Sequence, residues 1–392
     1  MNDYKYIVVG GGMTADSAVK GIRENDANGR IAAFSDEPEM PYNRPPLSKG
    51  LWKGESPESV WRETEGPNLD FHKGTRVTSI HPADKTIKTG GGQKFSYEKL
   101  LLATGGSPRR LPFGVDDVIY FRTLDDYRRL RAAAEKEDEF VIIGGGFIGS
   151  EVAAALAMNG KRVTMILSEA GICARIFPQE LSTFLVGYFA EKGVEICAGD
   201  TAVGIEKVDS KSTIRTKKGK EFKAATVVAG LGILPNDSLA RSAGLAVDNG
   251  IVVDAFLRTT NHDIFAAGDV ANFYYKALDK RVRVEHEDNS NSMGVMAGRN
   301  MTGRKEAYNH IPLFYSDMFD LGYEAVGELD SRMDVVEDWV ERHRKGVVYY
   351  MREGYVKGVL LWNTWGKVED ARELLKSRRR WTRDELVGKI RD

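Results

Sequence analysis

The chain has 392 residues, a length that suits two or three domains of roughly 150 residues each. Its 56 basic and 57 acidic side chains nearly cancel, so no net field favours nucleic acid or an acidic membrane surface. Two cysteines are too few for a disulfide scaffold and do not form a CxxC pair. The first strand-like run begins at Tyr4 and no stretch approaches a membrane span, so we expect no targeting segment and a cytoplasmic protein.

The first cluster of glycines follows an apolar, strand-like run that ends at Val9. The spacing there is G-x-G-x-x-A, which is typical of a strand, a tight turn and a helix that bind a dinucleotide. The second glycine lets the backbone approach a pyrophosphate, and the helix N-terminus offers N–H groups to the phosphate. An acidic residue further on would accept hydrogen bonds from ribose hydroxyls. The candidate residues are Gly10, Gly12, Met13, Thr14, Ala15 and Asp36.

The same pattern recurs after a second apolar run, which ends at Ile143. Gly144, Gly146 and Gly149 have the spacing G-x-G-x-x-G, and a helix-like segment and another apolar run follow. Either Ser168 or Glu169, just past that run, would contact the ribose. Because positions 168 to 170 hold no Arg or Lys to neutralise a 2′-phosphate, we expect NADH to be favoured over NADPH.

Two dinucleotide sites in one chain indicate one bound flavin and one exchanging nicotinamide cofactor. A third apolar strand ends in Ala103, Thr104 and Gly105. A fourth apolar strand is followed by Gly268 and Asp269 at its carboxyl end. In an open α/β sheet, this end faces the ligand crevice. Asp269 is a candidate for accepting a hydrogen bond from a flavin ribityl hydroxyl, and the alternative is a helix N-cap.

The order of these elements predicts an α/β protein with two Rossmann-like dinucleotide-binding domains and a small α+β C-terminal domain with an antiparallel sheet. The FAD-binding domain would be split between residues 1–118 and 250–308, with an NAD(H)-binding domain inserted at 119–249. In the C-terminal domain, 309–392, we expect three strands and a charged helix near 368–376. The basic stretch 376–383 is either a solvated face or an electrostatic docking patch.

Several stretches carry a resemblance to a known family. The chain resembles the flavin-dependent reductases of ferredoxin-like proteins, and more closely apoptosis-inducing factor and its prokaryotic relatives. The resemblance spans nearly the whole chain and implies an FAD-dependent NAD(P)H oxidoreductase. The stretches that carry it are Pro41–Lys49, Leu102–Arg109, Ile142–Glu151, Ala267–Asp269, Arg283–His286, Gly322–Glu324 and Leu361–Asn363.

The resemblance implies roles for residues around the flavin. Lys49 would pair with Glu151 near the flavin edge that receives hydride, and His286 would lie near the ring. From the residues alone, Lys49 fits an ordinary loop and His286 a helix start. Arg44, between Asn43 and a proline pair, would contact the pyrophosphate. The other expected flavin contacts are Asp36, Glu37, Val77, Ala103, Thr104, Gly105, Arg122, Gly268 and Asp269.

The resemblance also implies a set of nicotinamide contacts. Tyr315 stands where the family has a tryptophan that stacks near the cofactor. The chain matches neither the family's targeting region nor its long insertion in the third domain, so the death-related role is not expected. The remaining contacts would be Gly145, Gly146, Phe147, Ile148, Glu169, Gly232, Glu285, Glu324 and Asn363.

The absence of a cysteine between Pro41 and Pro45 bears on the reaction, because thiol-relay relatives carry one there. Cys173 and Cys197 are expected to be inert, and no metal site is expected. Electrons would therefore pass from the flavin directly to a small iron–sulfur protein, a quinone or oxygen. Two alternatives stay open. One is a ferredoxin or rubredoxin reductase. The other is a redox-sensing flavoprotein, in which a long-lived reduced-flavin–NAD complex changes the oligomeric state through a redox-dependent homodimer.

Overall fold

The computed structural model describes residues 2–113, 118–208 and 211–391. The chain forms two compact units, and each collects three segments that are separate in the sequence. The first unit contains Met1–Asn43, Glu58–Ser107 and Leu234–Pro312, and the second contains Arg44–Pro57, Pro108–Ile233 and Leu313–Asp392. The expected domain boundary at 118 directly follows residues 114–117, which lie outside the described residues. Three short elements lie where the chain passes between units: η3 (Pro57–Val60), β7 (Gly106–Pro108) and β16 (Ile233–Pro235).

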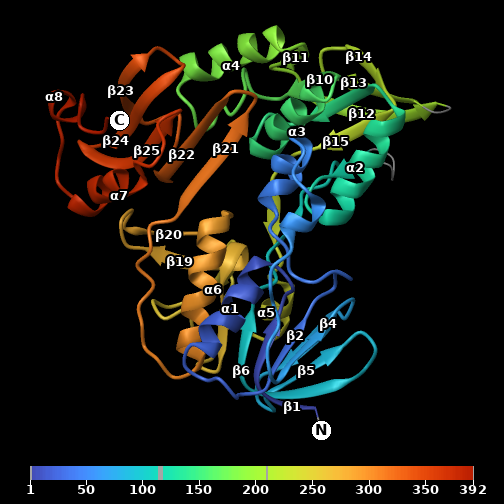
Figure 1. Ribbon diagram of the computed structural model, residues 1–392, viewed down its shortest axis with the longest axis vertical. Coiled ribbons are helices and arrows are strands. Elements are labelled where there is room, and N and C mark those ends of the chain that lie inside the picture. Colours follow the sequence, from blue (N-terminus) through green and yellow to red (C-terminus); the bar gives the residue numbers. More distant parts are fainter. Residues whose placement is uncertain (1, 114–117, 209–210, 392) are drawn as a thin grey trace. The chain divides into compact units, whose positions relative to one another are not determined.

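The first unit is built on a sheet with the strand order β3-β2-β1-β6-β5-β4, with β18 pairing with β6 (Figure 1). The strands around β1 are parallel, and β4 and β5 form an antiparallel edge. The four residues of β2 and the last four of β1 are all buried, as the uninterrupted apolar runs predict. The strands are β1 (Asp3–Val9), β2 (Ile31–Phe34), β3 (Leu69–His72), β4 (Val77–His81), β5 (Thr86–Thr89), β6 (Lys94–Leu102) and β18 (Ile264–Ala266).

Two long helices of the first unit, α1 (Met13–Arg23) and α6 (Glu287–Met301), pack closely along one another (Figure 1). Glycines make this approach possible, because a Cβ atom on Gly294 would lie 2.5 Å from the carbonyl oxygen of Thr14. A Cβ on Gly298 would clash with the carbonyl oxygen of Ala18. The smaller elements are α5 (Ser238–Ser242), η4 (Gly268–Val270) and the sheet of β17 (Ile251–Val252), β19 (Ala271–Tyr275) and β20 (Lys280–Val282).

The second unit contains a five-stranded parallel sheet with the order β11-β10-β9-β15-β8. An antiparallel three-stranded sheet, β12-β13-β14, belongs to the same unit. The strands are β8 (Ile119–Tyr120), β9 (Glu139–Ile143), β10 (Arg162–Leu167), β11 (Val194–Ala198), β12 (Ala202–Val208), β13 (Lys211–Thr216), β14 (Glu221–Ala224) and β15 (Thr226–Ala229). The helices are η1 (Pro45–Ser48), η2 (Gly50–Trp52), α2 (Leu124–Lys136), α3 (Phe147–Met158) and α4 (Gln179–Glu191).

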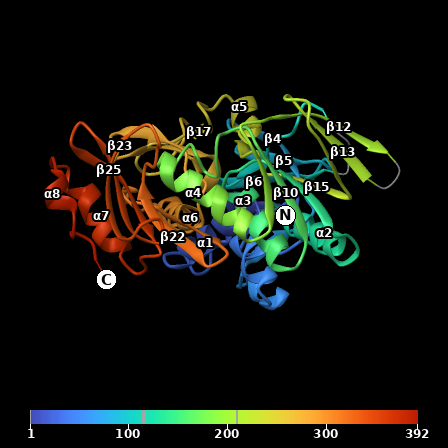
Figure 2. The same cartoon turned by 90° about the horizontal axis from the view of Figure 1, so that it is seen from above.

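The second unit also contains a five-stranded antiparallel sheet near the C-terminus, with the order β21-β22-β25-β24-β23. Three of its strands and its helix match the sequence prediction, whereas β21 (Leu313–Met318) and β22 (Leu321–Gly327) were not predicted. Helix α7 packs on β22 and β25, and α8 packs on β23 (Figure 2). The remaining bounds are β23 (Asp334–Glu341), β24 (Lys345–Arg352), β25 (Tyr355–Trp362), α7 (Val368–Ser377) and α8 (Arg383–Leu386). The predicted fold class is confirmed: two parallel dinucleotide-type sheets and a C-terminal antiparallel sheet.

Candidate active site

The first glycine turn has the geometry that a phosphate cradle needs. Gly10 adopts φ +138°, and a Cβ atom there would clash with the carbonyl oxygen of Ala103, so only glycine fits. Gly12 is the N-cap of α1, and no side chain among the described residues caps it. A Cβ on Gly12 would meet no atom within 4 Å. A phosphate can therefore approach the backbone at Gly12 closely, and the first turn of α1, with Met13, Thr14 and Ala15, offers it backbone N–H groups.

The second glycine turn repeats this arrangement at α3. Gly144 has φ +109°, and a Cβ on it would clash with the carbonyl oxygen of Gly230. Gly149 packs against the turn itself, since a Cβ there would clash with the carbonyl oxygen of Gly144. Gly146, the N-cap, has open space at its Cβ position and no capping side chain in the described chain. Two independent cradles of the same kind therefore fit two dinucleotide pyrophosphates.

The carboxylate of Glu169, just after β10, contacts two neighbouring side chains. It accepts a hydrogen bond from Ser168 at 2.6 Å and forms an ion pair with Arg175. Burial acts to raise the pKa of Glu169, but the Ser168 hydrogen bond and the Arg175 charge outweigh it and lower the pKa below its usual value. Glu169 is therefore ionised at neutral pH. This basic partner, Arg175, lies six residues after Glu169 and was not predicted from the sequence.

The expected adenosine contacts of the first unit differ in exposure. Asp36 is exposed after β2, whereas Glu37 is part-buried and accepts a hydrogen bond from Tyr42 at 2.6 Å. Val77 is buried in β4, where its side chain is 5% exposed. Glu37 thus has a fixed carboxylate, and Asp36 remains open to a ligand.

The strands that end near the first turn hold the other expected flavin contacts of this unit. Thr104 donates to the backbone oxygen of Asn236 at 2.7 Å, and the Asn236 side chain donates back to the oxygen of Thr104 at 2.9 Å. Gly105 and Gly268 both have positive φ, and a Cβ on Gly268 would clash with the Thr14 hydroxyl. Asn236 is a residue that the sequence analysis did not single out.

Asp269 and His286 flank the start of α6 within the first unit. Asp269 is 8% exposed and accepts a hydrogen bond from Ser290 at 3.1 Å. His286 is the N-cap residue of α6, and burial lowers its pKa to about 4, although the Asp269 and Asp288 charges oppose this. The imidazole is therefore neutral at pH 7. Glu285 forms an ion pair with Arg283 at 2.5 Å.

The second unit contains a buried ion pair between Lys49 and Glu151, with 2.7 Å between Nζ and Oε1. Glu151 lies in the first turns of α3 and is 3% exposed. Its carboxylate also accepts hydrogen bonds from Ser48 and Ser316, each at 2.6 Å. The Lys49 ammonium lies 5.4 Å from the centre of the Tyr315 ring. The resemblance predicted that Lys49 pairs with Glu151, whereas neither serine was predicted.

The expected nicotinamide contacts on the C-terminal sheet have structural bonds of their own. Asn363 has φ +45°; its side chain accepts from the Gly322 N–H at 2.7 Å and donates to the Arg344 carbonyl at 2.9 Å. Glu324 accepts from the Gly366 N–H at 3.2 Å. These contacts fix both side chains at the turn after β25.

Four further expected contacts also belong to the second unit. Arg44 donates to the backbone oxygen of Arg122 at 2.9 Å, so these two residues are in direct contact. Phe147, the first residue of α3, packs its ring against those of Phe314 and Tyr323. Gly232 has φ +81°.

The expected site residues therefore fall into two groups, each within one unit. The second unit brings Arg44 to Arg122, and Lys49 to Glu151 and Tyr315. The first unit holds Gly10, Gly12, Met13, Thr14, Ala15, Asp36, Glu37, Val77, Ala103, Thr104, Gly105, Gly268, Asp269, Glu285 and His286. The second holds Arg44, Lys49, Arg122, Gly144, Gly145, Gly146, Phe147, Ile148, Gly149, Glu151, Glu169, Gly232, Tyr315, Glu324 and Asn363.

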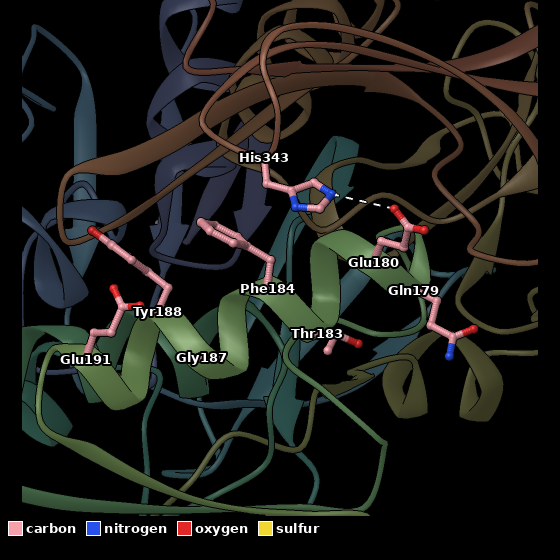
Figure 3. Close-up of a pocket in the computed structure, with 8 residues that line it drawn as sticks. All are labelled: Gln179, Glu180, Thr183, Phe184, Gly187, Tyr188, Glu191 and His343. Carbon is pink, nitrogen blue, oxygen red and sulfur yellow. Dashed lines mark ion pairs between the residues drawn. The ribbon is translucent and has the colours of Figure 1, made fainter.

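A surface pocket of about 620 Å³ lies along α4 and includes none of these residues (Figure 3). Its lining rings, Phe184, Tyr188 and His343, pack on one another, and the Arg344 guanidinium lies about 5 Å from the centres of the first two. His343 lies 3.9 Å from Glu180 (Figure 3). The Nε2 atom of His343 is buried and has no hydrogen-bond partner among the described residues, but none of the pocket's lining residues is a predicted site residue.

Both cysteines are buried. Burial raises the pKa of the Cys173 thiol to about 12, with the nearby Glu151 charge adding to this and a hydrogen bond to Ser150 opposing it. The Cys173 thiol is therefore not ionised at neutral pH and is a poor nucleophile.

Two phosphate cradles on separate parallel sheets, with a buried lysine–glutamate pair, define a flavin- and nicotinamide-dependent oxidoreductase. The chain belongs to the pyridine nucleotide-disulphide oxidoreductase family, whose model matches residues 4–294. A model of the C-terminal region of mitochondrion-associated apoptosis-inducing factor matches residues 297–343 and 337–377. Among the described residues, no helix is long and apolar enough to cross a membrane.

Three relatives illustrate the similarity. Apoptosis-inducing factor 1, mitochondrial, of Dictyostelium discoideum is 32% identical, covering 97% of this chain and 79% of the relative. The ferredoxin reductase subunit of a Sphingobium 5,5′-dehydrodivanillate O-demethylase is 31% identical, covering 99% and 97%. The crystal structure of a covalent putidaredoxin reductase–putidaredoxin complex superposes with a TM-score of 0.89 at 28% identity, covering 96% and 93%. The chain is thus an FAD-dependent NAD(P)H oxidoreductase, and the resemblance inferred from sequence is confirmed.

Proposed function

We propose that this protein oxidises NADH, collects the electrons on FAD, and passes them to a small iron–sulfur protein without a thiol relay. The observation that carries the two-cofactor part is the pair of glycine cradles, at Gly10 and at Gly144, in one chain whose 41–45 segment has no cysteine. The similarity to a ferredoxin reductase subunit and to putidaredoxin reductase supports the iron–sulfur acceptor. Bound FAD supplies the chemistry, because it accepts hydride and releases electrons singly or in pairs.

The chain's own residues would bind and orient the two cofactors. The N-termini of α1 and α3 hold the two pyrophosphates through the backbone N–H groups of their first turns. In this proposal Lys49, held by Glu151, presents a positive charge to the flavin edge that receives hydride. Neutral His286 borders the ring without adding a charge.

The preference for NADH rests on Glu169. In this proposal its ionised carboxylate accepts a hydrogen bond from an adenosine ribose hydroxyl, and a 2′-phosphate in that position would meet a like charge. Arg175 pairs with Glu169 and so partly offsets that repulsion. We propose that the Glu169 carboxylate determines the preference for NADH over NADPH. The charge of Arg175 counts for less because 83% of its side chain is exposed to solvent.

The domain assignment is part of the same proposal. Residues 1–118 and 250–308 would bind FAD, 119–249 would bind NAD(H), and 309–392 would form the C-terminal domain. A cytoplasmic location also stays a prediction from the sequence.

The acceptor is tested by measuring NADH-driven reduction of cytochrome c with and without an added small [2Fe–2S] ferredoxin. We expect fast reduction only when the ferredoxin is present; equal rates without it would contradict the proposed acceptor. Prompt reoxidation by a quinone or by air would instead favour those acceptors. A long-wavelength charge-transfer band that air removes slowly, together with a change in oligomeric state, would favour the redox-sensing alternative.

A further inference from the structure

The Glu151 carboxylate receives donors from three separate parts of the chain. Ser48 donates to Oε2 from η1, and Ser316 donates to Oε1 from β21 of the C-terminal sheet. Lys49 approaches Oε1 as well. Ser48 is 5% exposed and Ser316 is 1% exposed, so solvent cannot replace either hydroxyl in this contact.

These donors determine the orientation of the carboxylate. A carboxylate has about four acceptor positions and can rotate about its terminal bond unless both oxygens are held. Lys49 alone would hold one oxygen through a flexible four-carbon stem. With one serine on each oxygen, the plane of the carboxylate is fixed, and Oε1 is presented to the ammonium. A lone donor could not do this.

Strand β21 of the C-terminal sheet supplies a contact to each member of the ion pair. The Tyr315 side chain is more exposed than that of Ser316 and lies beneath the Lys49 ammonium, whereas Ser316 is buried against Glu151. Two consecutive residues of one strand thus contact both members of the ion pair.

We propose that Ser48 and Ser316 are positioning residues that act through Glu151 to hold Lys49 in the orientation needed for flavin reduction. The inference rests on the proposed function, since it assigns the Lys49–Glu151 pair to the flavin edge. It adds that the C-terminal sheet sets the rate of flavin reduction through one buried hydroxyl.

The test is anaerobic stopped-flow reduction by NADH of the FAD-loaded full chain carrying Ser48→Ala, Ser316→Ala or Ser316→Thr. Each alanine variant should lower the limiting rate about tenfold, as expected for losing a hydrogen bond to a charged group, with the half-saturating NADH concentration unchanged. Ser316→Thr keeps a hydroxyl and should recover most of the rate. Ser182→Ala is the control, because Ser182 is equally buried in the second unit and donates only to the Ile172 carbonyl among the contacts described.

The decisive arm repeats Ser316→Ala in a Glu151→Gln background, both by stopped flow and by urea unfolding of the same proteins. If the serine acts through Glu151, Ser316→Ala should change the reduction rate less than twofold in the Glu151→Gln background. It should also lower the urea concentration at the unfolding midpoint by less than it does in the wild-type protein. Equal losses in both backgrounds would overturn the inference. Reduction of the Glu151→Gln protein at the wild-type rate would instead overturn the proposed role of the ion pair itself. If Ser316→Ala does not fold, Ser316→Cys, which keeps the size with a weak donor, takes its place.

Discussion

Lys49 and Glu151 show how single residues far apart in the sequence form one chemical group. The ion pair buries both charges, with Lys49 12% exposed and Glu151 3% exposed. Removing one member of a buried pair leaves the other charge without compensation, so these side chains are expected to depend strongly on each other.

We expect Lys49→Ala to slow flavin reduction by NADH about a hundredfold while FAD stays bound, because a fixed charge near the reacting edge is lost. Rapid-reaction spectroscopy at 450 nm measures this, and FAD content is read from the same spectrum. Lys53→Ala is the matched control, since the ion pair described for Lys53 is a loose one with Asp317 at 3.8 Å, and both side chains are partly exposed. Unchanged reduction of the Lys49→Ala protein would remove the assigned role.

We expect Glu169→Gln to raise the ratio of kcat/KM for NADPH over NADH about tenfold, because it removes a charge that repels a 2′-phosphate and releases Arg175. Steady-state kinetics with both cofactors measure the ratio. Glu195→Gln, an exposed acid on β11 that accepts from Thr164, is the control. An unchanged ratio would show that residues other than Glu169 determine the preference between NADH and NADPH.

At the scale of elements, the strand–turn–helix units were the most predictable part of the molecule. The apolar runs before Gly10 and Gly144 are buried strands, and the following helices begin at Met13 and Phe147, as the spacing indicates. The spacing carries this information because a positive φ and a close backbone approach exclude any side chain at the first glycine. Strand β21 was missed because Leu313–Met318 mixes buried, part-buried and exposed residues without clear alternation.

We expect Gly10→Ala to lower the unfolding free energy by at least about 2 kcal/mol and to abolish FAD retention, because φ +138° and the Ala103 carbonyl both exclude a Cβ. Thermal unfolding and the flavin content of the purified protein measure the two effects. Gly66→Ala is the control, as Gly66 has open space around it and no positive φ. A stable, yellow Gly10→Ala protein would contradict the cradle geometry.

For the whole molecule, the sequence predicted the fold class and the resemblance predicted the ion pair, but the surroundings of that pair were not predictable. Ser316 lies 165 positions from Glu151, so their contact depends on how β21 registers against α3. Arg175 was not predicted because it is not adjacent to Glu169 in the sequence, and the loop between them brings it back to that carboxylate. Side-chain partners of this kind follow from tertiary packing and have no local signal.

The central claim, a flavin reduced by NADH without a thiol relay, is tested most directly by anaerobic titration of the FAD-loaded protein. We expect full bleaching of the flavin at about one equivalent of NADH per FAD, because no second two-electron carrier takes part. Consumption of about two equivalents would reveal a redox-active disulfide in addition to the flavin, and would contradict the account.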